Sequence, residues 1–128
     1  MKKIVTLLML SIVFFSCNKQ EGKGGTSSII GKVIVNDVNG AGVIQATYVG
    51  ADENVFIVYG KDNTTYNDKV STSYDGTYRF DNLIGGTYKV FSYSKCPGCD
   101  SGVKEVLVEV VVGDKKDVAT AADIVIEQ

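Results

Sequence analysis

The sequence predicts an all-β fold, a single β-sandwich of seven or so strands with Greek-key connections. Three observations predict it. Short runs of β-branched and aromatic residues recur from residue 28 onward, and Asn-Gly, Asp-Gly and Gly-Gly pairs separate them. No apolar pattern with a 3.6-residue period is long enough for a helix after the N-terminal segment. A chain of 128 residues, 45% of them hydrophobic, has room for one such domain.

Turn chemistry defines the strands in the first half of the domain. A strand at 29–35 is followed by Asn39-Gly40, a pair that favours positive φ and a tight turn, and the chain returns at 43–49. Residues 54–59 form a third apolar run. The polar segment 60–68 is then a long connection.

The second half alternates strands and tight turns in the same way. Asp75-Gly76 and Gly85-Gly86 mark two sharp turns. Between 87 and 94, Tyr88 and Val90 share one face, and Phe91 shares the other with Tyr93, which is the pattern of a half-buried strand. The expected strands are 69–73, 77–81, 87–94, 104–112 and 121–126.

The N-terminus has the three parts of an export signal. Lys2 and Lys3 precede a mostly apolar run of 12 residues, 4–15, which ends at the small residue Ser16. This run is too short to span a bilayer, because a membrane helix needs about 20 residues. We therefore expect residues 1–16 to be a cleaved signal peptide.

The four residues from Phe14 to Cys17 resemble the lipobox of bacterial lipoproteins, in which a small residue precedes the cysteine that carries the lipid. The resemblance implies that Cys17 carries acyl chains such as palmitate and anchors the mature chain to a membrane. Asn18 stands where many lipoproteins of the inner membrane have Asp, which points to the outer membrane, on its periplasmic or its outer face. The alternative is an ordinary signal with an incidental cysteine.

The predicted signal is followed by a segment of different composition. Residues 17–27 combine Cys17 with Gly, Lys, Ser and Thr, which is typical of a flexible tether, and residues 28–128 form the sandwich domain. Loss of the two signal lysines leaves 11 basic residues against 15 acidic ones, a net charge of −4. An acidic domain of this kind is not expected to bind nucleic acid.

The segment Ser71 to Val90 resembles the signature of carboxypeptidase regulatory-like, or transthyretin-like (prealbumin-like), domains. Residues 30–33, the turn at 39–40 and residues 46–49 resemble the first hairpin of the same family, so the resemblance covers about residues 28–126. It implies a non-catalytic accessory or stalk domain with no catalytic site to transfer. Within it, Asp75 and Gly76 are expected to make a hairpin, Phe80 and Leu83 to enter the core, and Tyr88 to form a tyrosine corner.

A related repeat, the B-type repeat of collagen adhesins, forms an internal isopeptide bond between a Lys and an Asn or Asp. Lys32 and Asp123 lie in the first and last expected strands, where such a pair would be found. The matching catalytic Glu motif is absent from this sequence. The alternative is that both side chains are simply exposed to solvent.

Cys96-Pro97-Gly98-Cys99 is the second chemically suggestive segment. Once Cys17 is lipidated, Cys96 and Cys99 remain as a pair in an oxidising compartment. We expect a structural disulfide that closes a tight loop, for which chain entropy gives only about 2 kcal/mol. The alternatives are a redox pair or a thiol-metal site, although redox cysteines usually lie at a helix N-terminus.

Acidic and aromatic residues suggest two kinds of ligand site. The candidate oxygen ligands for calcium are Asp52, Glu53, Asp62, Asn63 and Asp68, although no ordered calcium-loop spacing is present and solvated acidic loops are the alternative. Tyrosine rings stack on sugars, and the tyrosines most expected to be exposed are Tyr59, Tyr66 and Tyr74.

The sequence contains no histidine, which removes the usual general base at neutral pH and the commonest zinc ligand. We therefore expect no enzyme and no cofactor. The sequence favours a non-catalytic, membrane-anchored lipoprotein of the bacterial cell envelope, which acts as an accessory, spacer or binding module for an envelope protein or a glycan. The alternative is an envelope thiol-redox or metal-handling protein that uses Cys96 and Cys99.

Overall fold

The computed structural model describes residues 20–128, so the predicted signal peptide and Cys17 lie outside the described part of the chain. This part contains nine strands and no helix, and hence no helix that is long and apolar enough to cross a membrane. The strands are β1 (Lys23–Val38), β2 (Ile44–Val49), β3 (Asn54–Tyr59), β4 (Asp68–Ser71), β5 (Thr77–Leu83), β6 (Gly86–Lys95), β7 (Val103–Val112), β8 (Val118–Thr120) and β9 (Ile124–Glu127).

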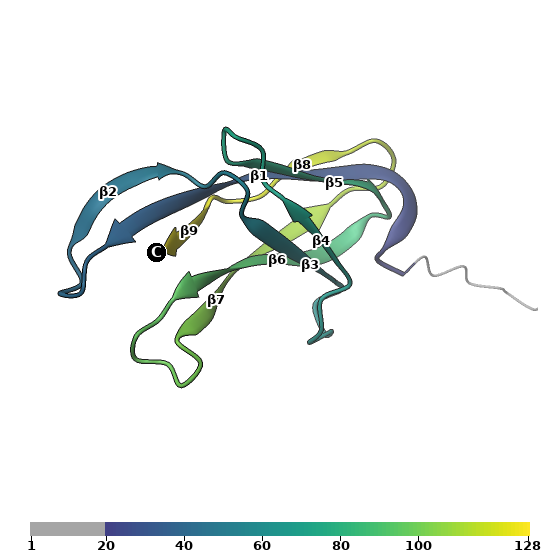
Figure 1. The fold of residues 1–128 in the computed structure, drawn as a ribbon. Helices are drawn as coiled ribbons and strands as arrows, with labels where there is room; N and C mark the ends of the chain where they lie inside the picture. Colours follow the sequence, from purple (N-terminus) through teal and green to yellow (C-terminus); the bar gives the residue numbers. More distant parts are fainter. Residues whose placement is uncertain (1–19) are drawn as a thin grey trace, which may run out of the picture.

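The strands form two sheets that pack as a sandwich (Figure 1). One sheet has the order β2-β1-β5, with β8 and β9 also paired to β1, and the other has the order β4-β3-β6-β7. The prediction of an all-β sandwich is therefore confirmed. The predicted number of seven strands is wrong.

Strand β1 is the centre of the five-stranded sheet. Its first half pairs antiparallel with β5 and parallel with β8, and its second half pairs antiparallel with β2 and parallel with β9. One long strand thus has different neighbours at its two ends. Strands β2, β5, β8 and β9 are therefore joined into one sheet through their pairing with β1.

The strand begins at Lys23, six residues before the predicted start at Ile29, so the predicted tether overlaps it. The reason is visible at Ser27, which is fully buried although its sequence context is polar. Its hydroxyl donates to the Gly113 carbonyl at 2.8 Å and accepts from the Asp117 amide at 3.1 Å. Satisfied hydrogen bonds remove the cost of burying a polar side chain, and composition alone does not reveal such partners.

The predicted last strand, 121–126, is wrong in its bounds, because the chain forms β8 before it, at Val118–Thr120, and β9 only from Ile124 to Glu127. Ile30 of β1 pairs with Thr120, and Val33 pairs with Ile124, so β1 advances three residues where the opposite segment advances four. The extra residue interrupts the ladder in the manner of a bulge. This interruption produces one of the additional strands.

The core lies between the sheets and follows the alternation of the strands. Tyr88 and Val90 of β6 face inward, as do Phe80 and Leu83 of β5, and all four are buried. The predicted alternation of β6 and the predicted burial of Phe80 and Leu83 are confirmed. The core residues are Ile29, Val33, Val35, Val55, Ile57, Tyr78, Phe80, Leu83, Tyr88, Val90, Val110, Val112, Ala121, Ile124 and Ile126.

Candidate functional site

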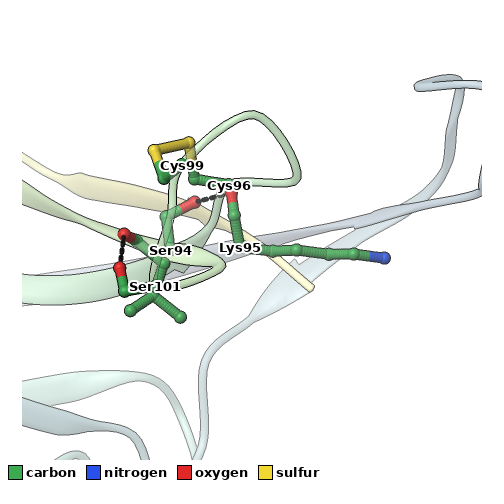
Figure 2. The surroundings of a disulfide bond; sticks show 6 residues. Ser94, Lys95, Cys96, Cys99 and Ser101 are labelled. Carbon is green, nitrogen blue, oxygen red and sulfur yellow. Dashed lines mark hydrogen bonds between the residues drawn. A yellow bond between two sulfur atoms is a disulfide. The ribbon is translucent and has the colours of Figure 1, made fainter.

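Cys96 and Cys99 form the predicted disulfide, with their Cα atoms 5.4 Å apart, in the loop between β6 and β7 (Figure 2). Backbone hydrogen bonds close the same loop, because the Cys96 amide donates to the Gly102 carbonyl at 2.8 Å and the Cys99 amide donates to the Cys96 carbonyl at 3.0 Å. Both cysteines are half-buried. The bond therefore joins two residues that the hairpin loop already holds together.

The acidic calcium candidates are not gathered into one site. Asp68 pairs with Lys23, with 3.1 Å between the carboxylate oxygen and the ammonium nitrogen, and this hydrogen bond raises the pKa of Lys23. Glu53 accepts a hydrogen bond from the Gln128 side chain, and Asp52 lies in a tight turn with φ of 54°. Asp62 lies in the exposed 60–67 loop. Across residues 20–128, no three His, Cys, Asp or Glu side chains lie close enough to hold a metal ion.

Asp75 and Gly76 form the tight turn before β5. The Asp75 carboxylate accepts from the Thr77 hydroxyl at 2.7 Å and from its amide at 3.1 Å, and the hydroxyl bond is the main reason that the pKa of Asp75 is lowered. Gly76 has φ of 80°, a region that favours glycine, and its amide donates to the Ser73 carbonyl at 2.9 Å. These residues shape the chain.

Tyr88 ties β6 to the start of β1. Its ring is fully buried, and its hydroxyl donates to the Ile84 carbonyl, four residues earlier. The Gly22 amide donates to the same hydroxyl oxygen at 2.8 Å. These are the contacts of a tyrosine corner, in which the ring fills the core and the hydroxyl holds a neighbouring connection.

Lys32 and Asp123 line the same cleft, which has a volume of about 730 Å³. Lys32 is half-buried in β1, and Asp123 is exposed in the segment between β8 and β9. Residues 20–128 show no ion pair between them. The cleft thus places the two residues at one site.

The three tyrosines that were expected to be exposed lie in different surroundings. Tyr74 is 89% exposed and stands alone in a turn, whereas Tyr59 is half-buried against Tyr88, with the two ring centroids 5.9 Å apart. Tyr66 is 47% exposed and leans on Phe56 at 4.8 Å. Only Tyr66 of the three belongs to an exposed aromatic group.

This group, which we call the aromatic face, consists of Phe56 of β3, Phe91 and Tyr93 of β6, and Tyr66 of the loop between β3 and β4. Phe56 and Phe91 are opposite each other in the ladder and stack at 5.0 Å, and Tyr93 stands edge-on to both, at 5.4 and 5.6 Å. Alternation along β3 and β6 places Phe56 and Phe91 on the outer side of the four-stranded sheet, opposite the core-facing Val55, Ile57 and Val90.

The outer side of a sandwich sheet is normally polar, so the aromatic face departs from the expected pattern. The two phenylalanines are buried by their neighbours, while the rings of Tyr66 and Tyr93 remain about half exposed. Sequence reasoning placed Phe91 and Tyr93 on one face of their strand, but it did not bring Phe56 to them. Only the pairing of β3 with β6 supplies that contact.

Charged and apolar residues of β7 continue this surface. Glu105 is the ladder partner of Tyr93, and Leu107, which is 45% exposed, is the partner of Phe91. Lys89 is opposite Glu109 in the same ladder. The aromatic face is thus bordered by an exposed aliphatic side chain and by charges of both signs.

Comparison with known proteins finds a distant structural likeness. No family model matches the chain, and no curated protein matches it. One similar solved structure is a "putative carbohydrate binding protein" from Pseudomonas aeruginosa, which shares 15% identity at a TM-score of 0.48. The alignment covers 79% of this chain and 90% of that one.

Proposed function

We propose that this chain is a non-catalytic binding module of the bacterial cell envelope, and that it binds a glycan on the aromatic face. The observation that carries the proposal is the pair of half-exposed tyrosines, Tyr66 and Tyr93, on the outer side of the four-stranded sheet. A pyranose ring has an apolar face of C–H groups and a rim of hydroxyls. A half-exposed tyrosine offers a matching ring face and a polar hydroxyl.

The packing of the aromatic face supports this proposal. Tyr93 contacts Phe56 and Phe91, and Tyr66 contacts Phe56, so both exposed rings rest on buried ones. Phe56, Phe91 and Tyr93 are in paired strands, which hold their positions more firmly than a loop would. Rings that are already held in place lose little freedom when a ligand binds.

The test compares tyrosines inside and outside the aromatic face. Soluble oligosaccharides of glucose, xylose and mannose are titrated into the purified protein. Binding is followed by calorimetry and by intrinsic tyrosine fluorescence, which no tryptophan obscures because the sequence contains none. Tyr93→Ala should weaken binding at least tenfold, about 1.4 kcal/mol, whereas Tyr74→Ala, which removes an exposed ring elsewhere, should leave it unchanged. Equal losses in the two variants, or no binding of any oligosaccharide, would overturn the proposal.

We further propose that Cys17 carries the lipid that anchors the module to the outer membrane. The four-residue lipobox resemblance, the signal-like residues 1–16 and Asn18 support this placement. Metabolic labelling with a palmitate analogue tests it directly. Label should enter the wild-type protein and fractionate with the outer membrane, and Cys17→Ser should remove both the label and the membrane association.

We also propose that the sandwich is a carboxypeptidase regulatory-like, transthyretin-like domain with Greek-key connections. The sequence segment 71–90 supports this assignment, together with the Asp75-Gly76 turn, the buried Phe80 and the Tyr88 hydroxyl contact at the positions where the family signature places them. An experimental structure that traces the connections between the sheets tests the assignment.

The alternative function, envelope redox chemistry or metal handling at Cys96 and Cys99, is distinguished by a reduction potential. Thiol trapping in graded glutathione buffers measures it. A potential below about −300 mV is that of a structural disulfide and fits the binding module. A potential between about −200 and −120 mV is that of a working thiol pair and would favour the alternative.

A further inference from the structure

The cleft that contains Lys32 and Asp123 also contains a buried polar atom without a partner. Tyr78 is 4% exposed, and its hydroxyl oxygen makes no hydrogen bond within residues 20–128. Buried polar groups in folded proteins are nearly always paired, so an unpaired one requires an explanation. Tyr78 lines the cleft, which suggests that the missing partner is an occupant of the cleft.

The position of this hydroxyl depends on Gly31. Tyr78 and Gly31 are directly opposite each other in the ladder between β5 and β1. A Cβ atom on residue 31 would lie 2.3 Å from the Tyr78 hydroxyl oxygen, so the ring crosses β1 where there is no side chain. The tyrosine thereby reaches over the central strand of its sheet.

The size and composition of the cleft fit a small organic ligand. Its volume of about 730 Å³ falls within the range of about 300–1,000 Å³ that is typical of ligand sites. Hydroxyl side chains from β4, β5 and β8 line it, together with the aliphatic side chains of Ile30 and Val70. A ligand here meets both hydrogen-bonding groups and apolar surface.

The charges around the cleft favour a neutral ligand. Lys32 and Asp123 contribute one charge of each sign, and Arg79 is already paired with Asp81. Within residues 20–128 Asp123 has no ion-pair partner, so its carboxylate is available to accept a hydrogen bond. Burial, reinforced by the charge of Asp123, raises the pKa of Tyr78 well above its ordinary value, so its hydroxyl stays protonated and donates.

We infer that the cleft is a second ligand site, which binds a neutral polyol such as a single sugar residue through the hydroxyl of Tyr78 and the carboxylate of Asp123. A sugar hydroxyl accepts from Tyr78, and the same or a neighbouring hydroxyl donates to Asp123. The C–H groups of the sugar pack on Ile30 and Val70. This site shares no residue with the aromatic face and does not depend on glycan binding there.

The test uses the purified full chain in detergent, with glucose, galactose, N-acetylglucosamine and myo-inositol as separate probes and glutamate as a charged comparison. Amide chemical shifts of residues 77–79 and 120–123 locate binding in the cleft. Tyr78→Phe removes only the hydroxyl, and Asp123→Asn changes an exposed carboxylate, so the second variant remains informative even if the first is poorly folded. Tyr93→Ala is the control for the aromatic face.

We expect at least one of the neutral probes to shift these amides, and each of the two cleft variants to weaken that binding at least tenfold. Tyr93→Ala should leave it unchanged, whereas the same variant should weaken oligosaccharide binding on the aromatic face at least tenfold. The inference is wrong if no neutral probe shifts the cleft amides, if both cleft variants bind as the wild type does, or if glutamate alone binds.

Discussion

Two buried tyrosines, one in each sheet, have opposite hydrogen-bonding states. Tyr88 in the four-stranded sheet is fully buried, and its hydroxyl donates to the Ile84 carbonyl and accepts from the Gly22 amide. Tyr78 in the five-stranded sheet is 4% exposed, and its hydroxyl has no partner among residues 20–128. Two tyrosines that are both buried therefore differ in their hydrogen bonds: the Tyr88 hydroxyl links two segments of the chain, and the Tyr78 hydroxyl lacks a partner within residues 20–128.

This difference shows how buried structural residues can be distinguished from ligand-binding ones in a small domain, by whether their polar atoms have hydrogen-bond partners within the fold. A buried hydroxyl with all its partners lowers the free energy of the fold, whereas one without a partner raises it. An unpaired buried group of this kind calls for a partner from outside the fold, such as a ligand or a water molecule. The two tyrosines and the residues that contact them can therefore be compared by mutation, one variant at a time.

The largest loss of stability is expected from alanine at Gly25, which packs on the backbone of the Leu83–Ile84 segment that Tyr88 contacts, and at Gly31, which is opposite Tyr78. A Cβ atom on Gly25 would lie 2.0 Å from the Leu83 carbonyl oxygen and 2.6 Å from the Ile84 amide nitrogen, and these backbone atoms cannot move without shifting the contact of Tyr88. Gly25→Ala should cost about 3 kcal/mol or more. Gly31→Ala should cost less, about 1–2 kcal/mol, because it meets the ring of Tyr78, which can tilt.

Urea denaturation of the two alanine variants measures this order. Gly40→Ala is the matched control, since no atom of residues 20–128 beyond its immediate chain neighbours lies within 4 Å of a Cβ atom at that position. A larger loss for Gly31→Ala than for Gly25→Ala would contradict the view that the backbone around the Tyr88 contact yields less than the ring of Tyr78.

The second-largest loss of stability is expected from removing the hydroxyl of Tyr88 itself. Tyr88→Phe keeps the ring but leaves the buried Gly22 amide and the Ile84 carbonyl without this partner. Removing one member of a buried hydrogen bond costs about 1–3 kcal/mol. Chemical denaturation of the variant should show that loss, and an unchanged free energy of unfolding would mean that the corner contributes packing alone.

The turns and the alternation of strands could be predicted from sequence because they are local properties. Asp75-Gly76 and the two faces of β6 follow from two residues or from a period of two. The early start of β1 could not, because Ser27 is stabilised in the sheet by Gly113 and Asp117, about 90 residues away in the chain. Long-range hydrogen bonds leave no local pattern in the composition.

The candidate sites follow the same rule. The disulfide could be predicted because its two cysteines are close in sequence. The contact between Phe56 and Phe91 depends on which strands become neighbours, and the state of the Tyr78 hydroxyl depends on the absence of a side chain on Gly31 opposite. Neither is visible until the register of the sheets is known.

A smaller effect of opposite sign is expected at Tyr78. Tyr78→Phe removes the unpaired hydroxyl and keeps the ring against Phe80, at 6.0 Å between centroids. The free energy of unfolding should rise by about 1 kcal/mol, because the variant no longer buries an unsatisfied polar group. Thermal and urea denaturation measure the change beside Tyr88→Phe, and a loss of stability would show that the hydroxyl already has a partner in the fold.

The smallest effect is a difference in alkaline stability. Burial is the main cause that raises the pKa of both tyrosines, but the Gly22 amide donates to the Tyr88 oxygen and opposes the shift there, whereas the charge of Asp123 adds to it at Tyr78. A tyrosine whose folded pKa is raised keeps more protons than the unfolded chain above about pH 10, so its contribution to stability is complete below that pH and falls as pH rises. The Tyr78 contribution should fall by about 0.7 kcal/mol between about pH 9.5 and 10.5. Tyr78→Phe should remove this loss, measured by urea denaturation at both pH values, and Tyr88→Phe should remove less of it. Equal slopes in the two variants would contradict the smaller shift expected for Tyr88, because they would mean that both hydroxyls stay protonated in the folded state throughout this pH range.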